Sequence, residues 1–143
     1  MVTKESKEET RRVWPDLKVI RTELGLSQVE MAVYLGMSVR AVQSCEQGWR
    51  KMSSSVEKVL LLMLIAHRQN GNLHQMACWD AVCCGAELRE RCPVFTTKLG
   101  YLCWYLSGNL CKGSRNLNWA DKLALCRKCS FFHVLLKEDV SPR

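Results

Sequence analysis

The chain has 143 residues, of which 48% are hydrophobic, and its formal net charge is +7. The hydrophobic fraction is that of a globular protein and argues against a wholly disordered chain. The basic surplus, 21 Lys and Arg against 14 Asp and Glu, permits binding to a polyanion but does not identify one.

The start of the chain carries no signal for export. Residues 1–13 mix both charges and lack the apolar run that a signal peptide needs, so we expect a flexible arm there. The longest apolar run, residues 59–66, is too short to span a bilayer. We therefore expect a cytoplasmic protein with no membrane partner.

Cysteine is concentrated in the second half of the chain. Only Cys45 lies in the first half, whereas the rest of the nine cysteines fall within residues 78–129. Such a shift in composition marks a domain boundary, which we place between residues 70 and 71. In a reducing compartment, dense cysteine favours metal or redox chemistry over a disulfide framework.

The first half carries the start and stop signals of four helices. The first is expected to begin at Trp14-Pro15-Asp16, with the proline in its first turn, and to end at Gly25. Ser27 and Glu30 have the spacing of a capping box for a second helix over residues 28–35. The apolar residues of this second helix that are expected to face the core are Val29, Ala32, Val33 and Leu35.

Two further helices follow a glycine turn. Ser38 is placed to cap a third helix, which is expected to end around Gln47-Gly48. Two short helices with a glycine in the turn between them form the helix-turn-helix pattern. A fourth helix is expected from the serine run to about Arg68, with Ser54 and Glu57 as its capping box. The apolar residues beyond its core-facing stripe predict a dimer or interdomain contact through Leu61, Leu62 and Ile65.

Three motifs have the order and spacing of one DNA-binding family. They are LGLSQVEMA at residues 24–32, LGMS at residues 35–38, and Glu46-Gln47-Gly48 at the exit of the third helix. On these motifs, the first half of the chain resembles the Cro/C1-type (xenobiotic-response-element) helix-turn-helix family. The chain departs from that family at Trp49, where Lys or Arg is common, and at Cys45, where a large apolar residue is usual. We interpret Cys45 as a small buried apolar residue and not as a sensor.

This resemblance implies that the third helix enters the major groove of double-stranded DNA. Arg40 suits a bidentate contact to guanine, and Gln43 suits one to adenine. Gln28, Arg50 and Lys51 are expected to contact backbone phosphates. Members of the family usually act as dimers, so we expect a homodimer on two half-sites about one DNA turn apart. The full expected DNA-binding set is Gln28, Ser38, Val39, Arg40, Gln43, Ser44, Arg50 and Lys51.

Cysteine spacing organises the second half of the chain. Cys78-Trp79 and Cys103-Trp104 are two Cys-Trp pairs, and Cys126-x2-Cys129 closes the set. On these motifs, the region resembles a cysteine module of bacterial sensory and regulatory proteins that is named for its two Cys-Trp pairs. Short helices are expected over residues 73–82 and 119–125. Cys83 is extra to the module, and the matching cysteines, all candidate metal ligands, are Cys78, Cys84, Cys92, Cys103, Cys111, Cys126 and Cys129.

The expected cofactor follows from the chemistry of these thiols. Two thiolates of one Cys-x2-Cys turn can bind a common metal in zinc and iron–sulfur sites alike. The matching cysteines exceed the four of one tetrahedral zinc, so they fit one four-cysteine cluster with spare thiols, or two metals that share ligands. We favour an iron–sulfur cluster and keep structural zinc as the alternative. Side chains near the thiols would exclude water (Trp79, Trp104, Phe131 and Phe132) or offset thiolate charge (Arg89, Arg91, Arg127 and Lys128).

Together these features predict a mainly α-helical regulator in four parts. We expect a sequence-specific transcription regulator without enzymatic activity or small-molecule substrate, whose cysteine-rich domain senses redox state, oxygen or metal. The alternative is a DNA-binding regulator whose zinc domain is purely structural and serves dimerisation or partner binding. A thiol oxidoreductase is disfavoured because the strand–helix pattern of thioredoxins is missing. The expected parts are the arm (1–13), the helix-turn-helix domain of four to five helices (14–70), the small cysteine-rich, cofactor-stabilised domain (71–136) and a C-terminal tail (137–143).

Overall fold

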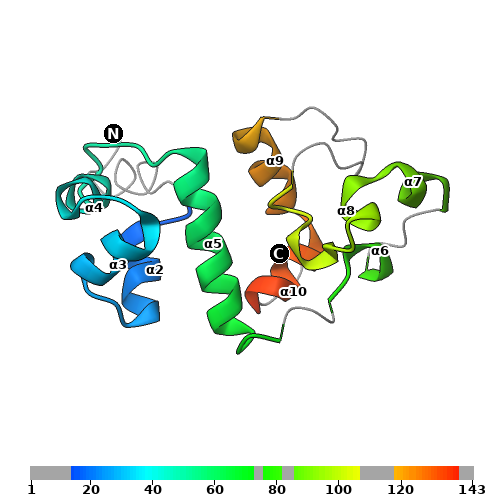
Figure 1. The fold of residues 1–143 in the computed structure, drawn as a ribbon, viewed down its shortest axis with the longest axis horizontal. Coiled ribbons are helices and arrows are strands. Elements are labelled where there is room, and N and C mark those ends of the chain that lie inside the picture. The colour runs from blue at the N-terminus through cyan, green and yellow to red at the C-terminus, as the bar shows by residue number, and fades with distance from the viewer. Residues whose placement is uncertain (1–13, 73–75, 82–85, 107–117, 139–143) are drawn as a thin grey trace, which may run out of the picture. The chain divides into compact units, whose positions relative to one another are not determined.

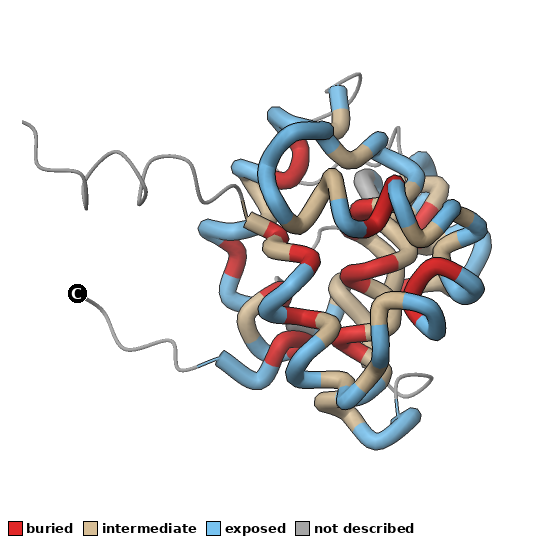
Figure 2. The backbone as a smooth tube through the Cα atoms, turned by 90° about the vertical axis from the view of Figure 1, so that its left-hand side faces the viewer, coloured by how far each residue is buried: buried red, intermediate tan, exposed pale blue. Residues whose placement is uncertain are grey.

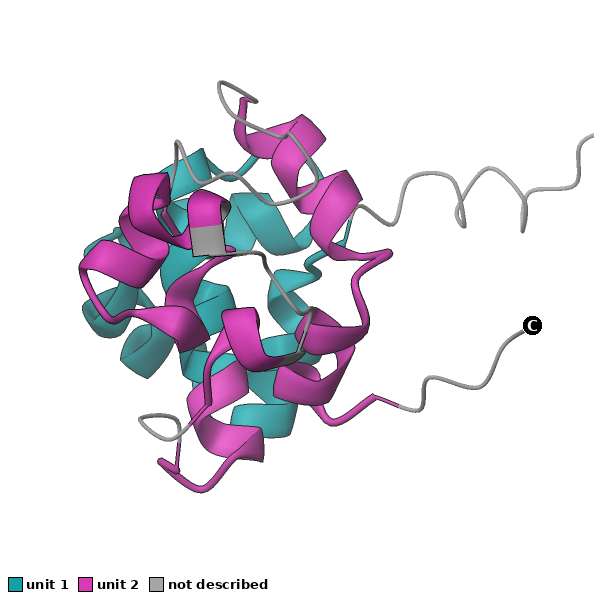
Figure 3. Ribbon diagram, turned by 90° about the vertical axis from the view of Figure 1, so that its right-hand side faces the viewer, with its two compact units in different colours: residues 1–64 teal, residues 65–143 magenta. Residues whose placement is uncertain are grey.

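The computed structural model describes residues 14–72, 76–81, 86–106 and 118–138. In this part of the chain every regular element is a helix, so the predicted mainly α fold is confirmed (Figure 1). None of the helices described has the length and apolarity that crossing a membrane requires. The chain divides into two compact units, Met1–Leu64 and Ile65–Arg143, at a point inside helix α5 (Ser54–Arg68) (Figure 3).

Three short helices open the first unit: α2 (Leu17–Leu24), α3 (Gln28–Leu35) and α4 (Val39–Glu46). Before each helix, a side-chain oxygen accepts a backbone N–H of the first turn at 3.1 Å, and the three capping residues are Asp16, Ser27 and Ser38. Gly25 and Gly36 end α2 and α3 in the left-handed conformation, with φ of +71° and +67°. The predicted ends of these helices, and the capping box of α3, are therefore confirmed.

Two helix starts differ from the expectation. Pro15 precedes the capping residue Asp16 and so lies outside the first turn of α2. At α5, the side chain of Ser53, and not that of Ser54, accepts the Val56 N–H at 3.3 Å. A capping oxygen must lie two or three residues before the N–H that it accepts, and because Ser54 is already the first helical residue, Ser53 takes this role.

The buried face of α3 also differs from the expectation. Met31 and Ala32 are buried, whereas Val29 and Val33 are 59% and 73% exposed. Figure 2 shows buried and exposed stretches alternating along the backbone. Residues four apart lie on the same face of a helix. Once Met31 and Ala32 turn toward the core, Val29 and Val33 must turn outward together, so the prediction that these two valines face the core is wrong.

Helix α5 extends to Arg68, as predicted. Asn70 and Gly71 follow it with φ of +52° and +79°. Leu61 and Ile65 are fully buried in the single chain, and Leu62 is half-buried. Of the residues expected to carry a dimer or interdomain contact, Leu62 is therefore the one that retains exposed surface for a partner chain.

The second unit continues from α5 with shorter helices. The helix expected over residues 119–125 is confirmed, and Asn118 caps it by accepting the Asp121 N–H at 2.8 Å. The helix expected over residues 73–82 is a single turn within the described residues, because Ala77 packs against Gly100 instead of joining it. The elements are α6 (Cys78–Ala81), α7 (Ala86–Arg91), α8 (Pro93–Thr96), the 3₁₀ helix η1 (Gly100–Leu102), α9 (Trp119–Cys126) and α10 (Ser130–Leu136).

Aromatic side chains lie in the core of the second unit. Trp104 and Phe132 are each 1% exposed, and their ring centroids are 6.0 Å apart. The Trp104 indole N–H donates to the Tyr101 carbonyl at 3.1 Å, which satisfies its one polar atom. Arg68 and Gln69 donate to the last carbonyls of α10 at 2.8 and 2.9 Å, where a helix otherwise leaves acceptors unpaired.

Candidate functional site

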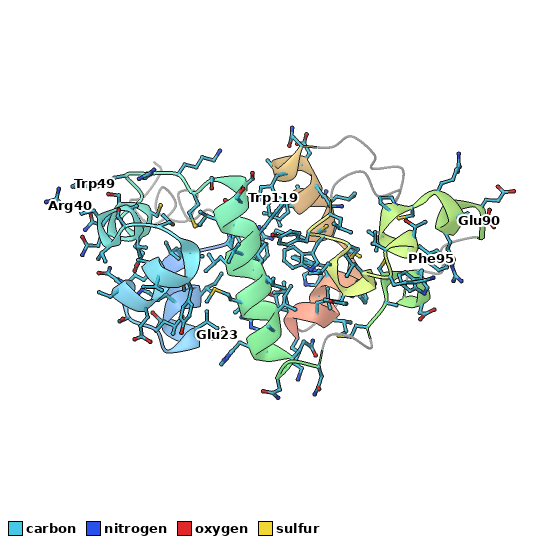
Figure 4. The ribbon with its side chains drawn as sticks, viewed as in Figure 1. Glu23, Arg40, Trp49, Glu90, Phe95 and Trp119 are labelled. Carbon is cyan, nitrogen blue, oxygen red and sulfur yellow. The ribbon has the colours of Figure 1, made fainter. Side chains whose placement is uncertain are left out.

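Helix α4 has a buried apolar face and an exposed polar face. Ala41 and Val42 are buried, whereas Arg40 and Gln43 are exposed. Figure 4 shows the Arg40 side chain extending outward from α4, on the same side of the first unit as Trp49. The polar face therefore presents the residue types expected of a base-reading helix. Val39 and Ser44, the other two predicted base readers, are half-buried.

Hydrogen bonds between amides link this face to the start of α3. Gln43 Nε2 donates to Gln28 Oε1 at 3.3 Å, and Gln28 Nε2 donates to Glu46 Oε2 at 3.3 Å. Because Gln28 uses both ends of its amide in this chain, its orientation is set by its neighbours. The structure thus brings together two of the predicted DNA-binding residues, Gln28 and Gln43, through direct contact.

An ion pair anchors the same chain of hydrogen bonds to α2. Arg21 donates from Nη2 to Glu46 Oε1 at 2.8 Å and from Nε to Glu46 Oε2 at 3.1 Å. Arg21 Nη1 also donates to the Leu26 carbonyl at 2.9 Å. The Glu46 side chain is only 4% exposed, and its hydrogen bonds raise the pKa of Arg21 above the usual value. The pair therefore fixes the end of α4 against α2 and the turn that follows it.

Sequence reasoning missed the role of Arg21. The Glu46-Gln47-Gly48 motif marked Glu46, but no motif marked Arg21 as its partner. The pairing depends on α2 and α4 lying side by side, which no local pattern shows. One signal for this pairing was available in the sequence. Arg21 occupies a helix position next to the apolar face of α2, where an apolar residue would be expected.

The segment after α4 carries two of the predicted phosphate contacts. Arg50 and Lys51 are exposed, and the backbone N–H groups of Trp49 and Arg50 donate to the Ser44 carbonyl at 2.9 and 3.2 Å. Trp49, where the resemblance expects a cation, is 84% exposed. These hydrogen bonds hold the start of the basic segment against the end of α4.

Cys45 does not lie in the core as expected. Its side chain is half-buried and lines a hollow of about 400 Å³ between the α3–α4 turn and the start of α5. The hollow is also lined by Ser38, Arg50 and Lys51. Burial raises the pKa of the Cys45 thiol, and the charge of Arg50 opposes this shift. Ala41 and Val42 are the buried residues of α4, and Cys45 lies at the edge of the hollow.

In the second unit, a close backbone approach brings two predicted ligands together. A Cβ added to Gly100 would lie 2.6 Å from the Ala77 Cα and 3.0 Å from a ring carbon of Trp79, so a side chain cannot be accommodated there. Helices α6 and η1 lie side by side as a result. Cys78 begins α6 and Cys103 follows η1, and their thiols are hydrogen-bonded to each other.

The two thiols of this pair are not equivalent. The hydrogen bond from Cys103 lowers the pKa of Cys78, whereas the same bond, together with burial, raises the pKa of Cys103 well above its usual value. Cys126 is close enough to add an electrostatic effect on Cys103. Cys78 and Cys103 are thus two predicted ligands that the structure brings together.

A buried lysine accompanies these thiols. Lys122 is only 4% exposed, and its charge acts to lower the pKa values of both Cys78 and Cys103. Lys122 is four residues before Cys126 on α9, so the two share a helix face. The sequence had predicted that four other cations offset thiolate charge: Arg89, Arg91, Arg127 and Lys128. Arg91, Arg127 and Lys128 are exposed. Arg89 instead donates a hydrogen bond to the Trp79 carbonyl at 3.3 Å.

The remaining described cysteines lie elsewhere in the second unit. Cys92 precedes α8 and is half-buried, and Cys129 precedes α10 and is buried. The Cys129 N–H donates to the Cys126 carbonyl at 2.8 Å, which closes the Cys-x2-Cys turn. The cysteines that the structure describes form no disulfide, and the described His, Cys, Asp and Glu residues form no group of three arranged to hold a metal. Cys83, Cys84 and Cys111 lie outside the described residues.

A histidine supports the Cys-x2-Cys turn. His133 Nδ1 lies 3.0 Å from a carboxylate oxygen of Glu138, and its Nε2 is hydrogen-bonded to the Arg127 carbonyl. Both ring nitrogens therefore have partners within the protein. His133 thus has a structural role at this turn.

The chain was compared with protein-family models, with curated proteins and with solved structures, and none of the three comparisons finds a match.

Proposed function

We propose that this protein is a sequence-specific DNA-binding transcription regulator whose α4 helix reads base edges in the major groove. The observation that carries the proposal is the hydrogen-bonded chain from Arg21 through Glu46 and Gln28 to Gln43. It orients an exposed amide at the centre of the polar face of α4, next to the exposed guanidinium of Arg40. An amide and a guanidinium are the side chains that pair bidentately with adenine and guanine.

Phosphate contacts would flank this reading face. Arg50 and Lys51 leave the end of α4 as an exposed basic segment, and Gln28 lies at the start of α3, where helix N–H groups favour an anion. Ser38 is the capping residue of α4 and corresponds to Ser27 of α3, one position before that of Gln28. The proposed homodimer would place two α4 helices on half-sites about one DNA turn apart.

The test of this proposal is selection from a pool of randomised duplexes with the purified protein. We expect enrichment of a short motif repeated at a spacing of about 10 base pairs. If no sequence is enriched at low salt, although the circular dichroism spectrum shows that the protein is folded, the proposal is contradicted. A protein whose α4 serves only protein contacts would give that result.

We also propose that the second unit binds a cysteine-ligated cofactor, either an iron–sulfur cluster or zinc. The described residues form no group of three arranged to hold a metal, so the proposal rests on donor chemistry. The soft thiols of Cys78 and Cys103 are in contact, Cys126 acts on Cys103 through its charge, and Lys122 is a buried cation that would offset thiolates. A tetrahedral site needs four ligands. Cys129, at the other end of the Cys-x2-Cys turn from Cys126, is the candidate for the fourth. A bound cluster would supply one-electron redox chemistry or oxygen sensitivity.

Two observations separate the sensing regulator from the structural-zinc alternative. A zinc site would be colourless and unaffected by air, whereas a cluster would give brown protein that contains iron and acid-labile sulfide and bleaches in air. The measurement is the visible spectrum and the metal content of protein purified without oxygen. Zinc at one equivalent or more, without iron, would overturn the sensing proposal and favour a structural domain used for dimerisation or partner binding.

A further inference from the structure

We propose that Cys78 and Cys103 are a redox pair that closes to a reversible disulfide when the cysteine site holds no cofactor. The inference deepens the proposed function, because both sulfurs are also proposed cofactor ligands. It assigns to this site a covalent modification with a defined pair of sulfurs. It also names the chemical class of the oxidant, a peroxide.

The geometry of the two segments carries the proposal. The contact of Gly100 with Ala77 leaves no room for a side chain between the segments, so α6 and η1 run side by side. Cys78 directly follows Ala77, and Cys103 directly follows η1. Their thiols are hydrogen-bonded to each other, so this close approach of the two segments also brings the two sulfurs within reach of one another.

The core of the second unit keeps this arrangement in place. Trp104, the neighbour of Cys103, is buried against Phe132 of α10, and Trp79, the neighbour of Cys78, contacts Phe95 edge-on with ring centroids 4.9 Å apart. Lys98 Nζ lies 3.9 Å from the Phe95 ring centroid and 5.9 Å from the Trp79 ring centroid. Each cysteine is therefore next to a tryptophan that packs against a second aromatic ring.

The other described cysteines are less suited to pair with either sulfur. Cys126 acts on Cys103 electrostatically, whereas Cys78 is in direct hydrogen-bond contact with it. Cys129 is buried at the start of α10, and Cys92 lies at the start of α8. Cys126 is thus the main competitor for Cys103, and the experiment must resolve the two pairings.

The chemistry balances with hydrogen peroxide as the oxidant. The sulfur of Cys78, which accepts the Cys103 hydrogen bond, attacks one peroxide oxygen; the O–O bond breaks, water leaves, and Cys78 becomes a sulfenic acid. The sulfur of Cys103 then attacks the Cys78 sulfur, the S–O bond breaks, and a second water leaves with the thiol proton. Two thiols are oxidised by two electrons, and one peroxide is reduced to two waters. A dithiol reductant reverses the step by thiol–disulfide exchange.

A disulfide here would remove two proposed ligands from the site at once. Cofactor-free protein that has reacted with peroxide could then bind the cofactor only after the disulfide is reduced. The pair would therefore make reloading of the site depend on the thiol redox state of the cell. It would also protect Cys78 from further, irreversible oxidation.

The experiment uses the full-length, cofactor-free protein, with circular dichroism to show that it is folded. One equivalent of hydrogen peroxide is added, remaining thiols are blocked, and the digested protein is analysed by tandem mass spectrometry without reduction. We expect a cross-linked peptide whose fragments join Cys78 to Cys103, a loss of two thiols per chain, and full recovery on treatment with a dithiol. Cys45→Ser, in the first unit, is the matched control and should give the same cross-link.

Three outcomes would overturn the proposal. They are a dominant Cys103–Cys126 link, a mixture of links that is the same in native and in denatured protein, and oxidation of Cys78 to sulfinic acid without any cross-link. None of these depends on whether the protein takes up a cluster, zinc or nothing. Failure of the disulfide and failure of the proposed cofactor are therefore distinguished, since cofactor uptake is measured separately on reduced protein.

Discussion

Arg21 of α2 holds Glu46 of α4 in a two-pronged ion pair, with nitrogen–oxygen distances of 2.8 and 3.1 Å. The carboxylate is almost fully buried and the guanidinium is 16% exposed, so water screens the pair only in part. The Gln28 amide occupies a further position on the same carboxylate. One ion pair thus links the stability of the first unit to the orientation of the polar face of α4.

Removing Arg21 should destabilise the first unit. Arg21→Ala leaves the Glu46 carboxylate buried without its cation, and we expect a loss of about 2 kcal/mol in the free energy of unfolding. Urea denaturation followed by circular dichroism measures this loss. The control is the double variant Arg21→Ala, Glu46→Ala, which should recover part of the loss because the stranded charge is gone. If the loss in the double variant equals the sum of the losses in Arg21→Ala and Glu46→Ala alone, the two residues are not coupled.

Variants of the reading face should lose specificity without losing stability. Arg40→Ala and Gln43→Ala each remove a side chain suited to a bidentate base contact, worth about 1–3 kcal/mol, so affinity for the selected DNA should fall tenfold or more. Titration of the selected duplex and of a scrambled duplex measures the effect, with unfolding curves as the control for stability. If both variants bind the selected duplex like the wild type, α4 is not the reading helix.

Variants of the basic segment should behave differently. Arg50→Ala and Lys51→Ala should weaken binding to selected and scrambled duplexes by the same factor, because phosphates carry no base identity. Each should also lower the slope of log affinity against log salt by about one unit. An unchanged slope would show that the side chain makes no phosphate contact in the complex.

A side chain at Gly100 should separate the two segments of the cysteine site. In Gly100→Ala the new Cβ would overlap the Ala77 backbone, which is 2.6 Å away, so α6 and η1 must move apart. We expect loss of metal from the purified protein and loss of the Cys78–Cys103 cross-link. The matched control is Gly71→Ala, which has a strained φ of +79° but meets no atom within 4 Å. Equal metal content in Gly100→Ala and wild type would contradict the site.

Loss of a ligand should be transmitted to DNA binding if the protein is a sensor. Cys126→Ser removes a thiolate, because a serine hydroxyl stays protonated, and should abolish cofactor binding. Cys45→Ser, in the other unit, should leave cofactor content unchanged. We expect cofactor-loaded and cofactor-free protein to differ in affinity for the selected duplex by a factor of about 5 to 150 at fixed salt. Equal affinities, with equal dimerisation constants, would leave the structural-zinc alternative ahead.

Most helix boundaries of the first unit were determined by the sequence itself, the starts of α2 and α5 excepted. Ser27 and Ser38 cap the backbone a few residues ahead, and Gly25 and Gly36 end helices through their own φ angles. These are local interactions, so the residues that make them are adjacent in the sequence and can be read there. The same holds for Asn118 at the start of α9.

Tertiary structure alone decided which residues meet across these helices. The pairing of Arg21 with Glu46, the contact of Gly100 with Ala77 and the position of Lys122 near the thiols all join segments that are distant in the chain. The outward turn of Val29 is of the same kind, because the face that a helix buries depends on the neighbour that covers it. Local propensity specifies where a helix begins and ends, whereas burial and pairing depend on packing between helices, which no single segment of sequence encodes.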